Sequence, residues 1–114
     1  MYKVLLVDDE RLELNTLKNY VDWTKLGIGT VYTANNGLQA LETAEFKKPD
    51  IVFTDIRMPV MDGIEFARQL REKDKRVKII FLTGYDEMDF IRQAFRLSAT
   101  DYILKPFLVE DIER

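Results

Sequence analysis

Short apolar segments alternate along this chain with segments whose apolar residues recur at helical spacing. The apolar segments are residues 4–7, 30–34, 51–54, 77–82 and 101–104. Strands that are apolar nearly throughout are buried on both faces of a sheet, and strands that alternate with helices form parallel β-α-β units. This alternation predicts an α/β fold, with a five-stranded parallel sheet and helices on both faces.

The segments between the expected strands have the periodicity of amphipathic helices. Their repeating residues are Leu14, Leu17 and Val21, then Leu38, Leu41 and Ala44, then Phe66, Ala67 and Leu70, then Met88, Ile91 and Phe95, with a fifth helix starting near Leu108. Asn35-Asn36-Gly37 predicts a turn that leads into an N-cap, and Asp62-Gly63 predicts a turn before the third helix.

Composition narrows the range of functions. The 114 residues have the length of one domain, and the hydrophobic fraction of 46% and charged fraction of 32% are typical of a soluble globular protein. No apolar run is long enough to span a membrane and no signal-peptide pattern is visible, so the expected location is cytoplasmic. The net charge of −3, without a long basic stripe, argues against direct nucleic-acid binding.

Cysteine and histidine are both absent from the sequence. Their absence excludes disulfides, thiol catalysis, serine-histidine triads and histidine-ligated zinc. Any metal must therefore be bound by oxygen ligands, which favour a hard cation such as Mg²⁺ or Ca²⁺.

Polar residues follow four of the five expected strands. They are Asp8, Asp9 and Glu10 after the first, Asp55 after the third, Thr83 and Gly84 after the fourth, and Lys105 after the fifth. In an open parallel sheet, ligands bind outside the carboxyl ends of the strands. We therefore expect these residues to converge on a single site.

The types of these residues suit phosphoryl chemistry. Clustered carboxylates repel one another, and a bound Mg²⁺ would relieve that repulsion. The Asp55 carboxylate can act as a nucleophile and form an acyl phosphate. Lys105 and Thr83 can supply a positive charge and a hydrogen bond to the phosphoryl oxygens.

Each residue taken alone also has a simpler interpretation. The acids after the first strand can favour a helix N-terminus, and Asp55 can be a turn residue. Thr83 can cap a helix, Lys105 can be a solvated surface charge and Tyr102 can belong to the core. Their convergence on one edge of the expected sheet is what favours a site.

Four segments together resemble the receiver domain of bacterial two-component response regulators, and the resemblance covers essentially the whole chain. They are Val7-Asp8-Asp9-Glu10, Thr54-Asp55-Ile56-Arg57-Met58-Pro59-Val60-Met61-Asp62-Gly63, Leu82-Thr83-Gly84 and Asp101-Tyr102-Ile103-Leu104-Lys105-Pro106-Phe107. The resemblance implies a flavodoxin-like fold with strand order 2-1-3-4-5. It also implies a signalling switch, which supports only its own Mg²⁺-dependent phosphorylation and slow dephosphorylation, rather than an enzyme.

The same resemblance implies a metal site and a phosphoacceptor. Asp55 would receive a phosphoryl group from a sensor histidine kinase. Asp9, Asp55 and the backbone carbonyl of Arg57 would bind Mg²⁺, and Asp8 would reach the ion mainly through water. Arg57 and Tyr85 would flank the phosphoryl group and slow the attack by water.

Residues at the other strand ends would respond to the phosphoryl group. Thr83 and Lys105 would contact it, and Gly84 would let the backbone approach. Tyr102 would swing inward as the switch aromatic. The surface formed by the fourth helix and fifth strand would change as a consequence.

A finer resemblance is to the receivers that precede an AraC-type helix-turn-helix DNA-binding module. It rests on residues 21–27, which lengthen the first loop, and on residues 84–86 and 98–102. Within the first loop, Trp23 is interpreted as a packing residue at a helix end. The chain stops about two turns into the fifth expected helix, so residues 1–114 are expected to be the receiver part of a longer regulator with a C-terminal output domain. Homodimerisation on phosphorylation is left open.

Two other functions stay open at this point. A Mg²⁺-dependent phosphohydrolase would usually have a second acid two residues beyond its nucleophile. Glu10 lies two residues beyond Asp8, as such an enzyme would require. Arg57 lies two residues beyond Asp55, which argues against this function. The other alternative is a degenerate receiver that only binds partners, and the complete set of acids, hydroxyl and ammonium argues against it.

Overall fold

The computed structural model describes residues 2–56, 58, 61–83 and 101–104, of which residues 83 and 101–104 are described by their backbone alone. The elements in chain order are β1 (Tyr2–Val7), α1 (Arg11–Tyr20), β2 (Ile28–Ala34), α2 (Gly37–Lys47), β3 (Ile51–Asp55), α3 (Gly63–Lys73), β4 (Lys78–Thr83) and β5 (Asp101–Leu104). The expected fourth and fifth helices lie outside the described residues. No helix in the described part of the chain has the length and apolar character needed to span a membrane.

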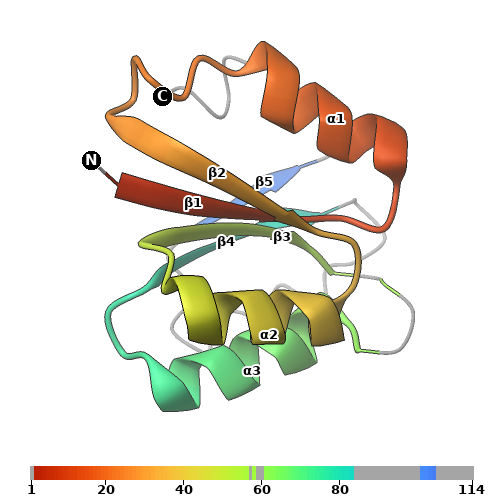
Figure 1. Cartoon of the computed structure of the whole chain (residues 1–114). Coiled ribbons are helices and arrows are strands. Elements are labelled where there is room, and N and C mark those ends of the chain that lie inside the picture. Colours follow the sequence, from red (N-terminus) through yellow and green to blue (C-terminus); the bar gives the residue numbers. More distant parts are fainter. Residues whose placement is uncertain (1, 57, 59–60, 84–100, 105–114) are drawn as a thin grey trace.

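The strands form one parallel sheet with the order β2-β1-β3-β4-β5, which confirms the predicted fold (Figure 1). The register aligns the carboxyl ends of neighbouring strands. Val7 pairs with Ala34 on one side and with Thr54 on the other, and Thr83 pairs with Leu104. The carboxyl ends of β1, β3 and β4 therefore lie at the same edge.

Alternate residues of β1 enter two separate cores, because successive side chains of a strand point to opposite faces. Leu5 and Val7 pack with apolar residues of α2 and α3, whereas Val4 and Leu6 pack with the core beneath α1. Figure 1 shows the corresponding layers, with α1 on one side of the sheet and α2 and α3 on the other. The four residues of the apolar run, Val4 to Val7, are all fully buried, as the run predicted.

Two expectations about individual residues were wrong. Strand β2 begins at Ile28 rather than at residue 30, because Gly29 interrupts the apolar run that marked the strand in the sequence. Leu38 was expected on the buried face of α2, but its side chain is 45% exposed. The buried stripe of α2 is centred on Ala40, Leu41 and Ala44, and Leu38 lies about a third of a turn outside it.

Both predicted turns cap the helices that follow them. The Asn36 side chain accepts a hydrogen bond from the Gln39 backbone N–H at 2.8 Å, and the Asp62 side chain accepts one from the Glu65 backbone N–H at 2.9 Å. Each cap satisfies a donor that the first turn of a helix leaves without an intrahelical partner.

Trp23 packs at the end of α1, as its position in the sequence predicted. Its indole Nε1 donates a hydrogen bond to the Leu17 carbonyl oxygen at 3.1 Å. Its ring is tilted against Phe53 of β3, with 5.8 Å between ring centroids. Trp23 therefore joins the loop between α1 and β2 to the core on the α1 face.

Candidate functional site

Three carboxylates meet at the carboxyl edge of the sheet. Asp8 and Asp9 follow β1, and Asp55 is the last residue of β3. Each offers an oxygen atom, and these oxygens all lie within 4.8 Å of one another. The structure thus brings together three of the predicted site residues, although they come from segments that are more than forty positions apart in the sequence.

Asp8 is held at this edge by the backbone around it. Its N–H donates a hydrogen bond to the Ala34 carbonyl oxygen at 3.2 Å, which extends the pairing of β1 with β2. Its side chain is fully buried, and its Oδ1 accepts a hydrogen bond from the Glu10 N–H at 2.9 Å. Glu10, expected with the other acids, contributes this backbone N–H to the site, and the chain turns there into α1.

Asp55 is also nearly buried, with 6% of its surface exposed. Its Oδ1 accepts a hydrogen bond from the Ile56 N–H at 2.8 Å, and its backbone carbonyl oxygen accepts one from the Thr54 hydroxyl at 2.9 Å. The Ile56 side chain is fully buried and anchors the backbone just beyond the strand. These contacts fix the direction of the Asp55 carboxylate.

Helix α3 begins directly against Asp55. The Gly63 N–H donates a hydrogen bond to the Ile56 carbonyl oxygen at 2.7 Å, and a Cβ atom on Gly63 would overlap the carbonyl oxygen of Asp55. The sequence indicated only a turn at Asp62-Gly63 and did not reveal this contact. The available signal was a glycine placed directly after an N-cap, where a side chain is ordinarily tolerated.

The start of α2 is tied to the same loop. The Gly37 N–H donates a hydrogen bond to the Met61 carbonyl oxygen at 3.1 Å, and a Cβ atom on Gly37 would also overlap that oxygen. Met61 packs against the core on the α2 and α3 face. Ile56 and Met61 are therefore held by the first residues of α3 and α2, respectively.

The remaining predicted site residues are only partly described. Thr83 ends β4 at the same edge as Asp55, and Tyr102 lies on β5 opposite Phe81. Four further predicted residues lie outside the described part of the chain: Arg57, Gly84, Tyr85 and Lys105. Their roles stay predictions.

The donor set fits a divalent cation. Two charged carboxylates whose oxygens lie within 4.8 Å of one another repel by at least about 3–4 kcal/mol at an effective dielectric constant of about 20. Carboxylate oxygens are the ligands that Mg²⁺ prefers, and Mg²⁺ commonly uses one or two of them and keeps several waters. One exposed and two buried acids in this arrangement therefore suit an ion that is partly hydrated.

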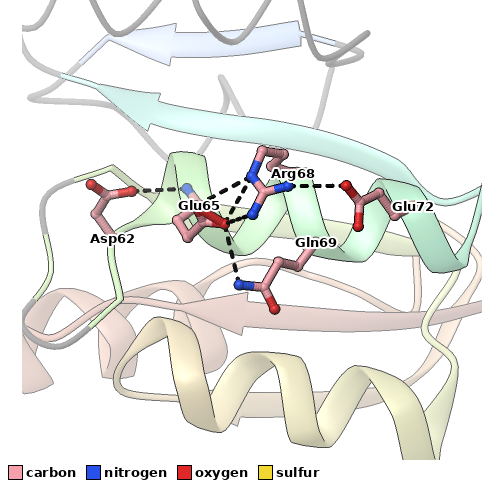
Figure 2. A network of polar contacts seen from close by, with 5 residues as sticks. All are labelled: Asp62, Glu65, Arg68, Gln69 and Glu72. Atoms are coloured by element: carbon pink, nitrogen blue, oxygen red, sulfur yellow. Dashed lines mark hydrogen bonds and ion pairs between the residues drawn. The ribbon is translucent and has the colours of Figure 1, made fainter.

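A polar network continues from the Asp62 cap along the exposed side of α3 (Figure 2). The Arg68 guanidinium donates hydrogen bonds to the carboxylates of Glu65 and Glu72, and the Gln69 amide donates one to Glu65 at 3.2 Å. The hydrogen bonds from Arg68 lower the pKa of Glu65, and the same pairing raises the pKa of Arg68. This network belongs to the helix surface and not to the carboxylate site.

A family model for the response regulator receiver domain matches residues 4–114. The chain belongs to the response regulator receiver domain family. Receiver domains are components of two-component signal transduction, so the resemblance found in the sequence is confirmed, together with its flavodoxin-like fold.

Relatives and solved structures of this receiver domain agree with the assignment. The uncharacterized transcriptional regulatory protein YesN of Bacillus subtilis is 38% identical over 106 residues, which cover 93% of this chain and 29% of that protein. The REC domain of AraT, a response regulator from Geobacillus stearothermophilus, superposes with a TM-score of 0.92 at 36% identity, covering 98% of this chain and 87% of that one. A two-component transcriptional regulator AraC from Clostridium phytofermentans gives a TM-score of 0.91 at 30% identity, covering 98% and 87%. The receiver domain thus spans less than a third of the length of YesN.

Proposed function

We propose that this receiver domain is a phosphorylation-dependent switch whose phosphoacceptor is Asp55. The observation that carries the proposal is the cluster of Asp8, Asp9 and Asp55 oxygens within 4.8 Å of one another at the carboxyl edge of the sheet. Ligands of open α/β sheets bind at this edge. Membership of the receiver family supports a switch over a phosphohydrolase or a module that only binds partners.

In this proposal, Asp9, Asp55 and the backbone carbonyl of Arg57 hold a Mg²⁺ ion, with Asp8 acting mainly through water. When bound, the ion supplies positive charge that offsets the repulsion among the carboxylates and the charge of an incoming phosphoryl group. The Asp8 side chain is fully buried, and the hydrogen bond from the Glu10 N–H fixes the direction of its carboxylate.

The reaction of Asp55 is a phosphoryl transfer. A carboxylate oxygen of Asp55 forms a bond to phosphorus as the bond between phosphorus and the imidazole nitrogen of a kinase phosphohistidine breaks, and the imidazole keeps the bonding electron pair. Transfer of this kind depends on positioning and charge more than on covalent assistance. The hydrogen bond from Ile56 to Asp55 Oδ1 provides the positioning from within this chain.

The other predicted residues complete the switch. Thr83 and Lys105 contact the phosphoryl group. Gly84, which has no side chain, lets the phosphoryl oxygens approach the backbone, and Tyr102 moves inward. The placement of Thr83 at the end of β4, next to the strand that carries Asp55, supports this assignment. The surface of the fourth helix and β5 then changes and reports the phosphorylated state.

Arg57 and Tyr85 are proposed to set the lifetime of the phosphorylated state. They would flank the phosphoryl group and hinder the approach of water. The substitution Tyr85→Ala is then expected to speed dephosphorylation, and an unaltered rate would remove Tyr85 from this role.

The partners follow from the same family. We propose a sensor histidine kinase as the phosphoryl donor, a cytoplasmic location, and an AraC-type DNA-binding output domain on the C-terminal side. The response regulator AraT and the transcriptional regulator AraC among the similar structures support that type of output. Homodimerisation on phosphorylation stays open. The proposal assigns DNA binding to the output domain and none to residues 1–114.

Labelling with acetyl phosphate tests the proposed function. Intact-mass analysis should show one added phosphoryl group when Mg²⁺ is present and none in excess EDTA. Asp55→Asn should abolish labelling, whereas Glu42→Gln, an equal change of charge on the exposed side of α2, should not. Unchanged labelling of Asp55→Asn would overturn the assignment, and sustained turnover of phosphate esters would favour a phosphohydrolase.

A further inference from the structure

A pocket of about 540 Å³ lies at the amino end of the sheet, on the edge opposite the three carboxylates. Its lining consists of Tyr2 at the start of β1, Leu26, residues 48–51, Asp74 and residues 76–78. In Figure 1 the start of β1, the segment between α2 and β3 and the segment between α3 and β4 all lie on the left side of the molecule, from the label N downward. Pockets of about 300–1,000 Å³ are the size that accommodates small organic ligands, and the proposed phosphorylation of Asp55 does not use this one.

Part of the lining is apolar. Val77 is 3% exposed, Pro49 is buried, and Leu26 and Ile51 are half-buried. Tyr2, whose surface is 60% exposed, adds an aromatic ring to the lining. This apolar surface can receive the body of a ligand and remove it from water.

The two carboxylates of the pocket are engaged by the backbone. Asp50 Oδ2 accepts a hydrogen bond from the Lys3 N–H at 2.8 Å. Asp74 Oδ1 accepts hydrogen bonds from the N–H groups of Arg76 and Val77 at 2.9 and 3.2 Å. Both acids thus stabilise the loops that shape the pocket, and their charges face the backbone amides.

The pocket also has three cationic side chains, Lys48, Arg76 and Lys78. All three are exposed, and among the described residues none of their charged groups has an ion-pair or hydrogen-bond partner. Lys48 is the C-cap residue that follows α2 and has the left-handed conformation, with φ +47°, where glycine or asparagine is ordinarily favoured. A long cationic side chain therefore stands at a backbone position that does not favour it.

We propose that this pocket binds a small organic anion with an apolar body. The anionic group would pair with Lys48, Arg76 and Lys78, and the body would rest on the apolar lining around Val77. Three cations against two engaged carboxylates leave the pocket with a net positive charge, although the whole chain has a net charge of −3. The site is separate from Asp55, so it does not depend on the proposed phosphorylation.

A matched pair of probes tests the proposal. The ¹⁵N-labelled chain is titrated with 2-naphthoate and, separately, with the neutral 2-naphthamide of nearly the same shape. We expect naphthoate to bind with a dissociation constant on the order of 1 mM, the affinity that the usual energy per ligand atom gives for a compound of this size. Amide shifts should map to Tyr2 and to residues 48–51 and 74–78, and naphthamide should bind at least about fivefold more weakly.

Substitutions then locate the anion. Lys48→Gln, Arg76→Gln and Lys78→Gln should each weaken naphthoate binding, and the triple variant should weaken it about tenfold or more. Lys18→Gln, an exposed charge change on α1, is the control and should leave the affinity unaltered. Equal binding of the two probes, shifts that map elsewhere, an undiminished affinity of the triple variant, or no saturation up to about 10 mM would each overturn the proposal.

Discussion

Gly63 lies so close to the carbonyl oxygen of Asp55 that its position has no room for a Cβ atom. Its N–H also donates a hydrogen bond to the Ile56 carbonyl oxygen at 2.7 Å. The first residue of α3 is therefore packed onto the backbone of the proposed phosphoacceptor. The position of that helix and the position of the Asp55 carboxylate cannot vary independently.

Gly63→Ala should destabilise the domain by about 3 kcal/mol, because inserting a methyl group into a filled site typically costs 1–3 kcal/mol and here the opposing atom is backbone. It should also slow labelling of Asp55 by acetyl phosphate. Urea denaturation measures the first effect. Gly27→Ala is the contrast, since Gly27 has φ +83° but nothing within 4 Å of the added atom, so it should cost only about 1 kcal/mol. Equal losses for the two variants would contradict the steric account.

Asp9→Asn should stabilise the domain in EDTA by about 1–2 kcal/mol, because it removes the repulsion of one carboxylate from two others. The gain is smaller than the unscreened repulsion because Asp9 is exposed to solvent. The same variant should lose most of the stabilisation by Mg²⁺, which for the wild-type chain is about 1.4 kcal/mol at ten times the dissociation constant. Denaturation with and without Mg²⁺ measures both. Glu42→Gln again controls for net charge. If Asp9→Asn kept the full response to Mg²⁺, Asp9 would not be a metal ligand.

Trp23→Phe should lower the free energy of unfolding by about 1–3 kcal/mol. The change removes the hydrogen bond to the Leu17 carbonyl oxygen and leaves a smaller ring against Phe53. The surrounding side chains only partly fill the cavity that results. Tyr20→Phe, at a side chain that is 74% exposed, should change stability by no more than about 0.5 kcal/mol. A Trp23→Phe variant as stable as Tyr20→Phe would show that the loop is not anchored through Trp23.

Glu65 should titrate below its ordinary pKa of 4.5, because the Arg68 hydrogen bonds favour the ionised carboxylate. A carboxylate with a lowered pKa in the folded state stabilises the fold above its unfolded pKa, and this contribution disappears as the pH falls through the folded pKa. Since the pair is exposed, the effect should be small and should weaken with salt.

The side-chain carboxyl resonance of Glu65, followed by NMR from pH 7 to pH 2, measures this pKa. Arg68→Gln should return it toward 4.5, whereas Lys18→Gln on the distant helix α1 should not. A Glu65 pKa that is identical in the wild type and in Arg68→Gln would show that the network of Figure 2 does not persist in solution.

Within the described residues, the sequence alone indicated the five strands and the first three helices in their order. The run from Val4 to Val7 required a strand buried on both faces, and the structure places its residues alternately in two cores. Asn36 and Asp62 predicted their caps, because capping depends only on residues within one helical turn. The receiver family could also be recognised from the sequence, since its motifs are short contiguous segments whose recognition does not require the three-dimensional structure.

The tertiary structure was needed for features that depend on contacts between residues far apart in the sequence. The meeting of Asp8 and Asp55 was expected from the sequence, but its geometry results from the pairing of β1 with β3. The need for glycine at positions 37 and 63 arises from backbone atoms of other segments. Leu38 follows the helical pattern yet remains exposed, because burial depends on where the sheet lies against α2. Local preferences involve neighbours along the chain, whereas close packing involves neighbours in space, and only folding brings the latter together.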